Sequence, residues 1–473
     1  MVDFQTGMSG LLATSKQLNT VGNNIANSST VGYKRSSASF GDMYANGLTN
    51  VPGMGVSTGY IGQDFSQGGT KATNNNLDLT IAGAGFFKMA KADPNYPQDS
   101  TRQTYSYTRD GQFHLSNDGY IINSDGLRLQ GVNFLDSSGN FITTTSNSQT
   151  VPLSSDNPAI NNLATSSIHI PVDSPATQKT TQINLAVNLD MRATNGTIDA
   201  LDAATATAID PQDASTYTTS TNVTVYDSLG NSHQVNLYFA KDSVAGSNTW
   251  YVYGDVDGKT PTGGPTGTSA PSYFGTLQFK DDGSLDTGAS TVLDNTAGPM
   301  HTIPAFTLGN GAENLFKRAL NADGSFASVP WLDLSGSTQL ADASAVNTRS
   351  QNGLPPGSLT DVQVNDQGVV IGKYSNGLER ELGMVKLSDF RDPTALQPIG
   401  NNQWAATGSS GQPIENFVGA GGTGTLLSKT VEQSNVELTN ELVDLIALQR
   451  QYQANSQTIS AQSSTLQTLV NLR

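Results

Sequence analysis

The chain has 473 residues and a formal net charge of −16 at pH 7, and 36% of its residues are hydrophobic and 14% charged. This length predicts several domains, because a single hydrophobic core rarely grows beyond about 250 to 300 residues. The acidic charge argues against a nucleic-acid partner, since phosphate binding requires clustered Lys and Arg. The absence of cysteine excludes disulfides, thiolate metal sites and cysteine nucleophiles.

The first residues contain neither the basic region nor the apolar run of a Sec signal peptide. No stretch approaches the ~20 consecutive apolar residues that cross a bilayer. We therefore expect no membrane insertion. If the protein leaves the cell, it uses another export route.

An amphipathic helix is predicted from residue 4 to about residue 27. Apolar residues recur along it every seven positions, at Phe4, Leu11, Leu18 and Ile25. Such a heptad stripe marks a helix that buries a seam against other helices. An ordinary amphipathic helix in a globular core is the alternative.

Residues 29–75 are rich in Gly, Ser, Thr and Asn and carry scattered aromatic residues. This segment is too long for a bare loop in a compact domain. We predict an extended linking arm that docks on neighbouring surfaces through its aromatic residues. A flexible linker is the alternative.

From Leu77 the apolar period changes to two, which predicts β-strands. Asp-Gly dipeptides begin at residues 110, 118 and 125, and we expect consecutive hairpins there because Asp-Gly tolerates positive φ. Strands of the same type resume after Pro355-Pro356. Residues 76–174 and 346–429 are therefore predicted to form one inner β domain.

Residues 175–345 are predicted to form an outer β domain inserted into the inner one. Alternating apolar residues from Ile183 to Leu189 indicate one strand. A hairpin is expected from residue 223 to residue 239, with Trp250 and Val252 extending it. Turn-rich segments account for the remaining loops.

A second long helix is predicted over residues 436–472, with a length of roughly 55 Å. Ser434 and Glu437 have the spacing of a capping box at its start. Polar residues are predicted at the second position of its seam, namely Gln449, Ser456 and Ser463. Its apolar heptad stripe consists of Leu438, Leu445, Tyr452, Ile459 and Leu466.

Neither terminal helix carries enough apolar surface to form a domain alone, so we expect the two to pack together and against other copies. We assign residues 1–28 and 430–473 to this terminal helical domain. The predicted fold class is multidomain, with mainly β outer domains and an α-helical coiled-coil domain made from the N- and C-terminal helices.

The sequence indicates no enzymatic chemistry. The four histidines, at positions 114, 169, 233 and 301, lie far apart and lack a two-histidine metal spacing. Residues 419–424 fit Gly-x-Gly-x-x-Gly, but no βαβ unit surrounds them, which favours a hinge over a nucleotide site. We expect no catalytic residue, no cofactor and no metal site.

Four sequence blocks resemble the motifs of bacterial flagellar rod and hook proteins. Two lie in the N-terminal part, at residues 24–34 (NIANSSTVGYK) and 77–87 (LDLTIAGAGFF). The others run from YTRDG to GLRLQG at residues 107–131 and from SNVEL to QRQYQAN at residues 434–455. The large insertion and the final residues TLVNLR resemble the hook proteins rather than the shorter rod proteins.

This resemblance implies a structural subunit of the flagellar hook, which self-assembles into a bendable tube and transmits torque from rod to filament as a universal joint. It implies terminal helices in the inner wall, an arm that bridges neighbouring subunits, and β domains in the outer layers. The implied partners are further copies of the chain, the rod, hook cap and hook–filament junction proteins, and the flagellar type III export apparatus. The implied location is the hook of the basal body, outside the cell after export.

The heptads and the resemblance together define two sets of candidate residues. The first set is expected to form the helical subunit interface: Phe4, Met8, Leu11, Leu18, Ile25, Leu438, Leu442, Leu445, Tyr452, Ile459, Leu466 and Val470. The second set carries the family motifs: Asn24, Ala26, Asn27, Thr30, Gly32, Tyr33, Lys34, Gly83, Gly85, Phe86, Phe87, Gln449, Arg450 and Tyr452.

Two other functions stay open at this point. One is a different axial protein of the same organelle, such as a distal rod or hook–filament junction protein. The other, more remote, is a secreted β-rich adhesin or glycan-active enzyme with coiled-coil ends.

Overall fold

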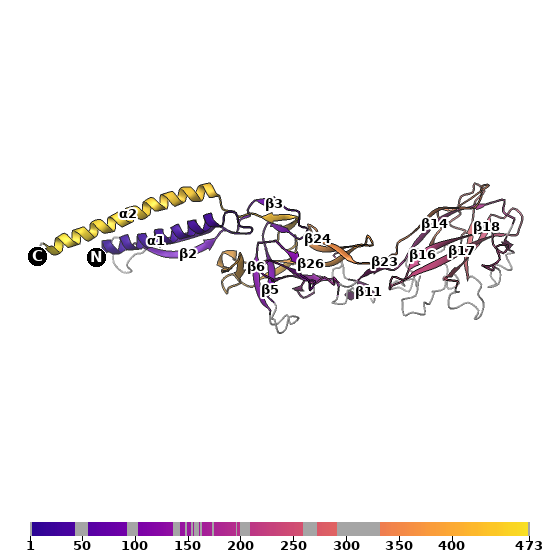
Figure 1. The fold of residues 1–473 in the computed structure, drawn as a ribbon, viewed down its shortest axis with the longest axis horizontal. Coiled ribbons are helices and arrows are strands. Elements are labelled where there is room, and N and C mark those ends of the chain that lie inside the picture. The colour runs from indigo at the N-terminus through magenta and orange to yellow at the C-terminus, as the bar shows by residue number, and fades with distance from the viewer. Residues whose placement is uncertain are drawn as a thin grey trace.

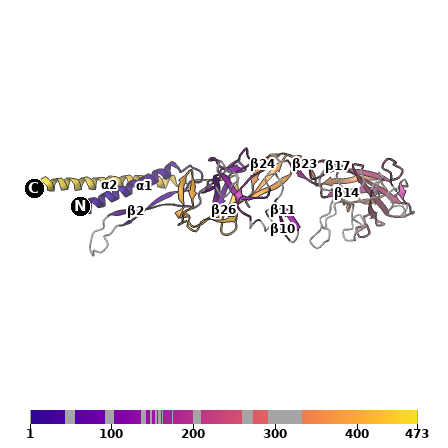
Figure 2. The same cartoon turned by 90° about the horizontal axis from the view of Figure 1, so that it is seen from below.

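The computed structural model is elongated, with two helices at one end and β-sheets following one another toward the other end (Figures 1 and 2). Both chain termini lie at the helical end, and the middle of the sequence forms the opposite end (Figure 1). The structure describes residues 2–42, 55–91, 103–135, 142–146, 149–152, 155, 160, 163–172, 175–194, 196–198, 209–258, 272–290 and 332–471.

The two helices are α1, Val2–Ala26, and α2, Leu438–Asn471. They lie side by side and run in opposite directions (Figures 1 and 2). The fold is thus mainly β, with terminal helices that pack together, as the sequence predicts. At about 1.5 Å per residue, the 34 residues of α2 span roughly 51 Å.

The start of α2 differs from the prediction. Ser434 Oγ accepts a hydrogen bond from the Val436 backbone N–H at 3.2 Å, and the first helical residue is Leu438. The carbonyl of Glu437 accepts from the Glu441 N–H at 3.1 Å. The predicted capping box is therefore wrong, because Ser434 closes a local turn before the helix begins.

The segment after α1 forms an antiparallel hairpin of β1, Ser36–Asp42, and β2, Val56–Gln63. The hairpin lies along α1 (Figure 1), and the Val56 N–H donates to Ser9 Oγ at 3.1 Å. Further on, β3, Thr70–Ala72, pairs with β31, Thr430–Glu432, just before α2. The end of the segment that follows α1 is therefore joined by a strand pair to the segment just before α2.

The central part of the molecule is a 12-stranded sheet that combines strands from both sides of the long insertion. Its longest path runs β24-β25-β26-β9-β5-β6-β28-β27, with β7, β8, β12 and β29 joined to it. The strands of this sheet are β5 Phe86–Lys91, β6 Thr104–Thr108, β7 His114–Leu115, β8 Ile121–Ile122, β9 Arg128–Asn133, β12 Ser166–Ser167, β24 Leu359–Val364, β25 Val369–Tyr374, β26 Glu379–Asp389, β27 Gln397–Gly400, β28 Gln403–Ala405 and β29 Ile414–Phe417.

Shorter elements flank this sheet. The strands β4, Leu79–Ala82, and β30, Thr425–Ser428, pair with each other, and so do β10, Thr143–Ser146, and β11, Gln149–Pro152. A short 3-10 helix, η3, spans Pro393–Ala395. The core beneath the sheet is aliphatic and aromatic, with Ile81, Phe87 and Leu387 fully buried.

Two of the three Asp-Gly dipeptides form hairpin turns. Gly119 and Gly126 adopt φ of +78° and +75° and connect β7 to β8 and β8 to β9. At Asp110-Gly111 the predicted hairpin is wrong: the Gly111 carbonyl accepts a hydrogen bond from the Leu79 N–H at 2.9 Å. Gly is needed there for close approach, since a Cβ would lie 1.7 Å from the Leu79 carbonyl oxygen.

The far end of the molecule contains two further sheets around one core that includes Trp250 and Phe239. One sheet contains β14 Ile183–Asp190, β20 Leu332–Asp333, β21 Thr338–Leu340 and β22 Ala345–Gln351. The other contains β15 Thr197–Ile198, β16 Thr219–Tyr226, β17 Ser232–Asp242, β18 Thr249–Val256 and β19 Ser272–Gln278. The antiparallel pairing of β16 with β17, and of β17 with β18, confirms the predicted hairpin and its extension.

Between the central sheet and the far-end sheets, β13, Ala176–Gln178, pairs with β23, Leu354–Gly357. We call this strand pair the neck. In sequence, β13 leads to the far end and β23 leads back from it. Figure 1 shows β23 between the two β regions.

Candidate assembly interface

Small residues of α1 face α2 and allow the two helices to approach closely. A Cβ at Gly7 would lie 3.1 Å from Ile459 Cγ1, and one at Gly10 would lie 3.3 Å from Asn455 Nδ2. Asn455 Nδ2 also lies 3.4 Å from Thr14 Oγ1, to which it donates. The seam between the helices is therefore narrow and partly polar.

The second line of α2 residues that faces α1 is shifted by one position from the prediction. Glu441 and Leu448 are buried, and Asn455 and Gln462 approach glycines of α1. The predicted polar line, Gln449, Ser456 and Ser463, is exposed instead. The prediction placed the second line four residues after the apolar stripe, whereas the line that faces α1 lies three residues after it. Both lines are mostly polar, so apolar periodicity did not distinguish them.

The predicted interface residues fall into three groups in the single chain. Met8, Leu438, Leu442 and Tyr452 are exposed, and Leu11, Leu18, Ile25, Leu445 and Ile459 are half-buried. The side chains of Phe4, Leu466 and Val470 lie outside the described residues. The exposed members are available to another chain.

Three further apolar residues are exposed on the helices and lie outside the predicted interface set. Val443 is 61% exposed, Ile446 52% and Leu12 55%. Leu438, Leu442 and Ile446 are spaced four residues apart, which places them on one face of α2. This spacing was visible in the sequence, but a strict search for a seven-residue period passes over it.

Asn24 connects three segments at the end of the helical pair that faces the β regions. Its Nδ2 donates to the Ser36 carbonyl at 2.8 Å and to Glu441 Oε2 at 3.1 Å. Its Oδ1 accepts from the Tyr33 hydroxyl at 3.1 Å and from the Ser36 N–H at 2.9 Å. Asn24 is 1% exposed, so all of its hydrogen bonds are made inside the protein.

Glu441 completes this network from the first turn of α2. Its Oε1 accepts from Arg35 Nε at 2.5 Å, and this hydrogen bond raises the pKa of the Arg35 guanidinium. Burial, together with the nearby Glu441 charge, raises the pKa of Tyr33. The end of α1, the start of β1 and the start of α2 are thus tied together by polar side chains.

A second polar cluster connects the same region to the central sheet. Lys34 Nζ lies 2.7 Å from Glu432 Oε1, and Arg109 Nη1 lies 3.5 Å from Glu432 Oε2. All three side chains are buried. Burial lowers the pKa values of Lys34 and Arg109, and the Glu432 carboxylate opposes both shifts.

The turn that carries Lys34 fits closely against the sheet. Gly32 adopts a φ of +71°, and a Cβ there would lie 2.7 Å from the Asp110 backbone nitrogen. Its N–H donates to the Glu432 carbonyl at 2.8 Å, and Asn402 Nδ2 donates to the Val31 carbonyl at 2.8 Å. Gly is required at this position by both conformation and contact.

The other motif residues lie in different parts of the structure. Phe86 and Phe87 are buried in the central region, and Gly83 and Gly85 adopt positive φ beside them. Asn27 and Thr30 bond within the turn after α1, whereas Ala26, Gln449 and Arg450 are exposed. The structure therefore brings Asn24, Tyr33 and Lys34 together at the junction and leaves the C-terminal motif residues on the surface of α2.

Four family profiles match the chain in sequence order. Residues 4–34 match the flagella basal body rod protein profile, and residues 80–200 match the flagellar hook protein FlgE/F/G D1 domain. Residues 194–354 match the flagellar basal body protein FlaE D2 domain, and residues 427–472 match the flagellar basal body rod FlgEFG protein C-terminal profile.

Relatives match over the whole length. The flagellar hook protein FlgE of Salmonella typhimurium is 33% identical over 473 residues and covers 100% of both chains. That of Escherichia coli is 34% identical over 472 residues, covering 99% of this chain and 100% of the relative. The chain belongs to the flagellar hook protein family.

This membership confirms the resemblance seen in the sequence motifs, and the hook family consists of structural proteins rather than enzymes. A crystal structure of Helicobacter pylori flagellar hook protein FlgE2 is similar at 14% identity, with a TM-score of 0.42. It covers 76% of this chain and 100% of that chain.

The described residues of this hook-family chain contain no group of three or more His, Cys, Asp or Glu side chains that could hold a metal ion. Residues 419–424 form a turn between β29 and β30, with the Gly419 N–H bonded to the Gly424 carbonyl at 3.0 Å. The predicted hinge between domain and helix is thus a turn between two strands. No helix within the described ranges is both long and apolar enough to span a membrane.

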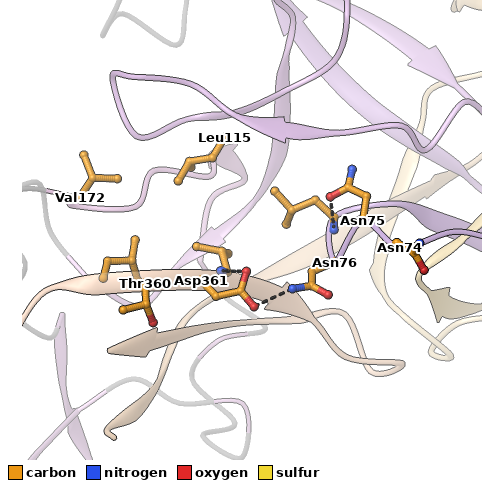
Figure 3. Close-up of a pocket in the computed structure, with 10 residues that line it drawn as sticks. Asn74, Asn75, Asn76, Leu115, Val172, Thr360 and Asp361 are labelled. Carbon is orange, nitrogen blue, oxygen red and sulfur yellow. Dashed lines mark hydrogen bonds between the residues drawn. The ribbon is translucent and has the colours of Figure 1, made fainter. Parts of the chain in front are cut away.

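A cleft of about 400 Å³ lies beside the central sheet, between residues 74–77 and β24 (Figure 3). Asn76 Nδ2 donates to Asp361 Oδ2 at 2.6 Å, and the Leu77 N–H donates to Asn75 Oδ1 at 3.2 Å (Figure 3). Leu115 and Val172 form its apolar side. Thr360 Oγ1 donates to the Lys373 carbonyl at 2.9 Å, so its hydroxyl is held by the neighbouring strand.

Proposed function

We propose that this chain polymerises into the flagellar hook as a tube, in which α1 and α2 form a coiled-coil inner wall and the β regions lie outside. The observation that carries this proposal is the exposed apolar face of α2. Leu442, Val443 and Ile446 are 43 to 61% exposed in the single chain, and apolar groups so arranged favour contact with another surface. Further copies of the same chain supply that surface.

Each sequence range is assigned a proposed place in the tube. Residues 1–28 with 430–473 form the tube-lining helices, and residues 29–75 form an arm that bridges neighbouring copies. Residues 76–174 with 352–429 form the inner β domain, and residues 175–351 form the outer one. The predicted boundary after residue 345 moves because β22, Ala345–Gln351, pairs with β14 at the far end. The hairpin along α1 and the exposed Tyr60 and Ile61 on β2 support a bridging role for the arm.

The hook location follows from family membership. We further propose that the assembled tube transmits torque while it bends, as a universal joint. Its partners are the rod, the hook cap and the hook–filament junction proteins, and its subunits travel through the flagellar type III export apparatus. The packed but partly polar helix seam supports this proposal, because a weak seam is able to adjust as the tube bends.

Deletion of residues 436–473 tests tube formation directly. We expect the β regions to stay folded, since their cores contain none of these residues. Electron microscopy of the truncated protein should show no tubes, while circular dichroism should keep the β signal. Tubes of normal length from the truncated chain would falsify the proposal.

A further inference from the structure

In the described part of the chain, the side chain of Asn376 bonds the neck to the central sheet. This residue lies in the turn between β25 and β26. Its Nδ2 donates to the Ala176 carbonyl on β13 at 3.0 Å and to the Pro355 carbonyl on β23 at 2.6 Å. One amide thus bonds to both strands of the neck.

The position of Asn376 is itself fixed by its turn. Its Oδ1 accepts from the Leu378 N–H at 3.1 Å, and Gly377 adopts a φ of +82°. The preceding Ser375 N–H donates to the Ser358 carbonyl at 2.8 Å. Gly357 completes the fit, because a Cβ there would lie 2.5 Å from Asn376 Cγ. The side chain therefore has little freedom to leave the neck.

The neck is also held from the far end of the molecule, by the turn between β16 and β17. A Cβ at Gly230 would lie 2.7 Å from both Pro356 and Thr177, one on each neck strand. Thr177 Oγ1 donates to the Ser228 carbonyl at 3.1 Å. The buried Asp227 carboxylate holds this turn by accepting from the Leu229 and Asn231 N–H groups at 2.9 and 2.8 Å.

We propose that Asn376 is a positioning residue that sets the angle between the central sheet and the far-end sheets. A two-stranded connection alone is a weak support, because an isolated strand pair is only marginally stable. By donating to both strands, Asn376 makes the neck continuous with the β25–β26 hairpin. The far-end sheets then move together with the central sheet.

If the chain forms a tube, as the proposed function requires, this arrangement has a further consequence. If the angle within each chain is fixed, bending of the tube changes the contacts between chains rather than the neck. Asn376 would then help to determine which lateral contacts the outer β region is able to reach.

The test uses the isosteric change Asn376→Asp in the full-length chain. It keeps the Oδ1 acceptor for Leu378 but replaces the donor with a carboxylate oxygen that repels two carbonyls. Asn365→Asp is the matched control. Asn365 holds the turn at the other end of β25, where its Oδ1 accepts from Gln367 and Val369, and it has the same change of charge.

The natural chain has no cysteine, so spin labels at Ser409→Cys and Ala245→Cys report one distance between the exposed surfaces of the two β regions. Pulsed electron resonance on the dilute, unassembled protein should give a narrow distribution for the parent chain and for Asn365→Asp. Asn376→Asp should broaden the distribution and shift its maximum. Because the measurement needs no polymer, its result is independent of whether tubes form.

Gly357→Ala provides a second perturbation of the same contact, because its methyl group displaces the Asn376 side chain. It should broaden the distribution in the same way. Thermal unfolding followed by circular dichroism verifies that each variant is folded. A distribution for both variants that matches the parent overturns the proposal.

Discussion

Single polar side chains hold the helical pair to the β regions, and Asn24 is the clearest of them. The sequence identified Asn24, Tyr33 and Lys34 through the family motif, but it gave no partner for any of them. Glu432 and Glu441, which complete the two clusters, are nearly four hundred or more residues away in sequence. No local pattern connects such distant groups, so their pairing becomes visible only in the folded chain.

Asn24→Asp should weaken the junction strongly. The change removes two donated hydrogen bonds and places a carboxylate next to that of Glu441, which we expect to cost about 3 kcal/mol. Thermal unfolding and tube assembly of the purified protein measure the effect. Asn23→Asp, at an exposed position of the same helix, is the control and should behave like the parent.

The pairing within this junction is checked by a double variant. Glu441→Gln added to Asn24→Asp restores an amide opposite a carboxylate, so part of the lost assembly should return. If the double variant assembles no better than Asn24→Asp alone, the Asn24–Glu441 contact is not what the single change disrupts.

Asp110 gives the central region a dependence on pH. Burial, with the nearby Asp78 and Asp125 charges adding to it, raises the pKa of Asp110 to about 6 from the ordinary value of 3.8. Between pH 3.8 and pH 6, the folded protein keeps the Asp110 carboxyl protonated, whereas the unfolded chain releases this proton. The contribution of the protonated carboxyl to the free energy of unfolding is fully present below pH 3.8 and is lost as the pH rises through 6.

Asp110→Asn should therefore stabilise the protein at pH 8 by up to about 3 kcal/mol, because a shift of one pKa unit corresponds to about 1.4 kcal/mol. The amide oxygen still accepts from the Gln112 N–H, as Oδ1 does at 3.1 Å in the parent. Denaturant unfolding at pH 8 and pH 3.5 measures the difference. The advantage should vanish at pH 3.5, and an equal advantage at both values would show that the carboxylate charge is not its cause.

At the scale of elements, the apolar periodicity of the sequence predicted most helices and strands, while contacts between distant residues determined the remaining features. The heptad found both helices and one line of the seam, since Leu445 and Ile459 lie half-buried in it. It placed the second line one position too late, because polar residues occupy both candidate positions and the apolar period does not choose between them. Likewise, the Asp-Gly rule succeeded at residues 118 and 125 but failed at Asp110-Gly111, where contact with Leu79 decides the conformation.

The exposed face of α2 is tested with Val443→Ser and Ile446→Ser combined. Both residues are more than half exposed, so the change should leave the folded chain intact while it weakens contacts between copies. We expect the concentration needed for polymerisation to rise at least about tenfold, which corresponds to ~1.4 kcal/mol. Light scattering against protein concentration measures it.

The combined control, Gln451→Ser with Gln457→Ser, changes two exposed polar residues of the same helix. It removes no apolar surface, and it lowers helix propensity more than the test pair does, because Val and Ile are close to Ser in propensity and Gln is better. Polymerisation of the control should start near the parent concentration. Equal effects of the two pairs would contradict a role for the apolar face.

At the scale of the whole molecule, the chain leaves the helical end, reaches the far end and returns. The sequence indicated this path, because similar strands occur on both sides of an insertion, and β9 indeed pairs with β26. It did not indicate how the two β regions are held together. That depends on Asn376 and Gly230, which belong to ordinary turns in the sequence and acquire their role only through distant carbonyls and side chains.

The helices of this long molecule are of unequal length, and α2 continues past the N-terminal end of α1 (Figures 1 and 2). Gln467, near the C-terminal end of α2, is exposed in the single chain. Its surroundings are therefore set by whichever molecule lies beside it. The overhang is a natural position for a fluorescent reporter, whose colour or anisotropy would distinguish free subunits from polymerised ones in real time.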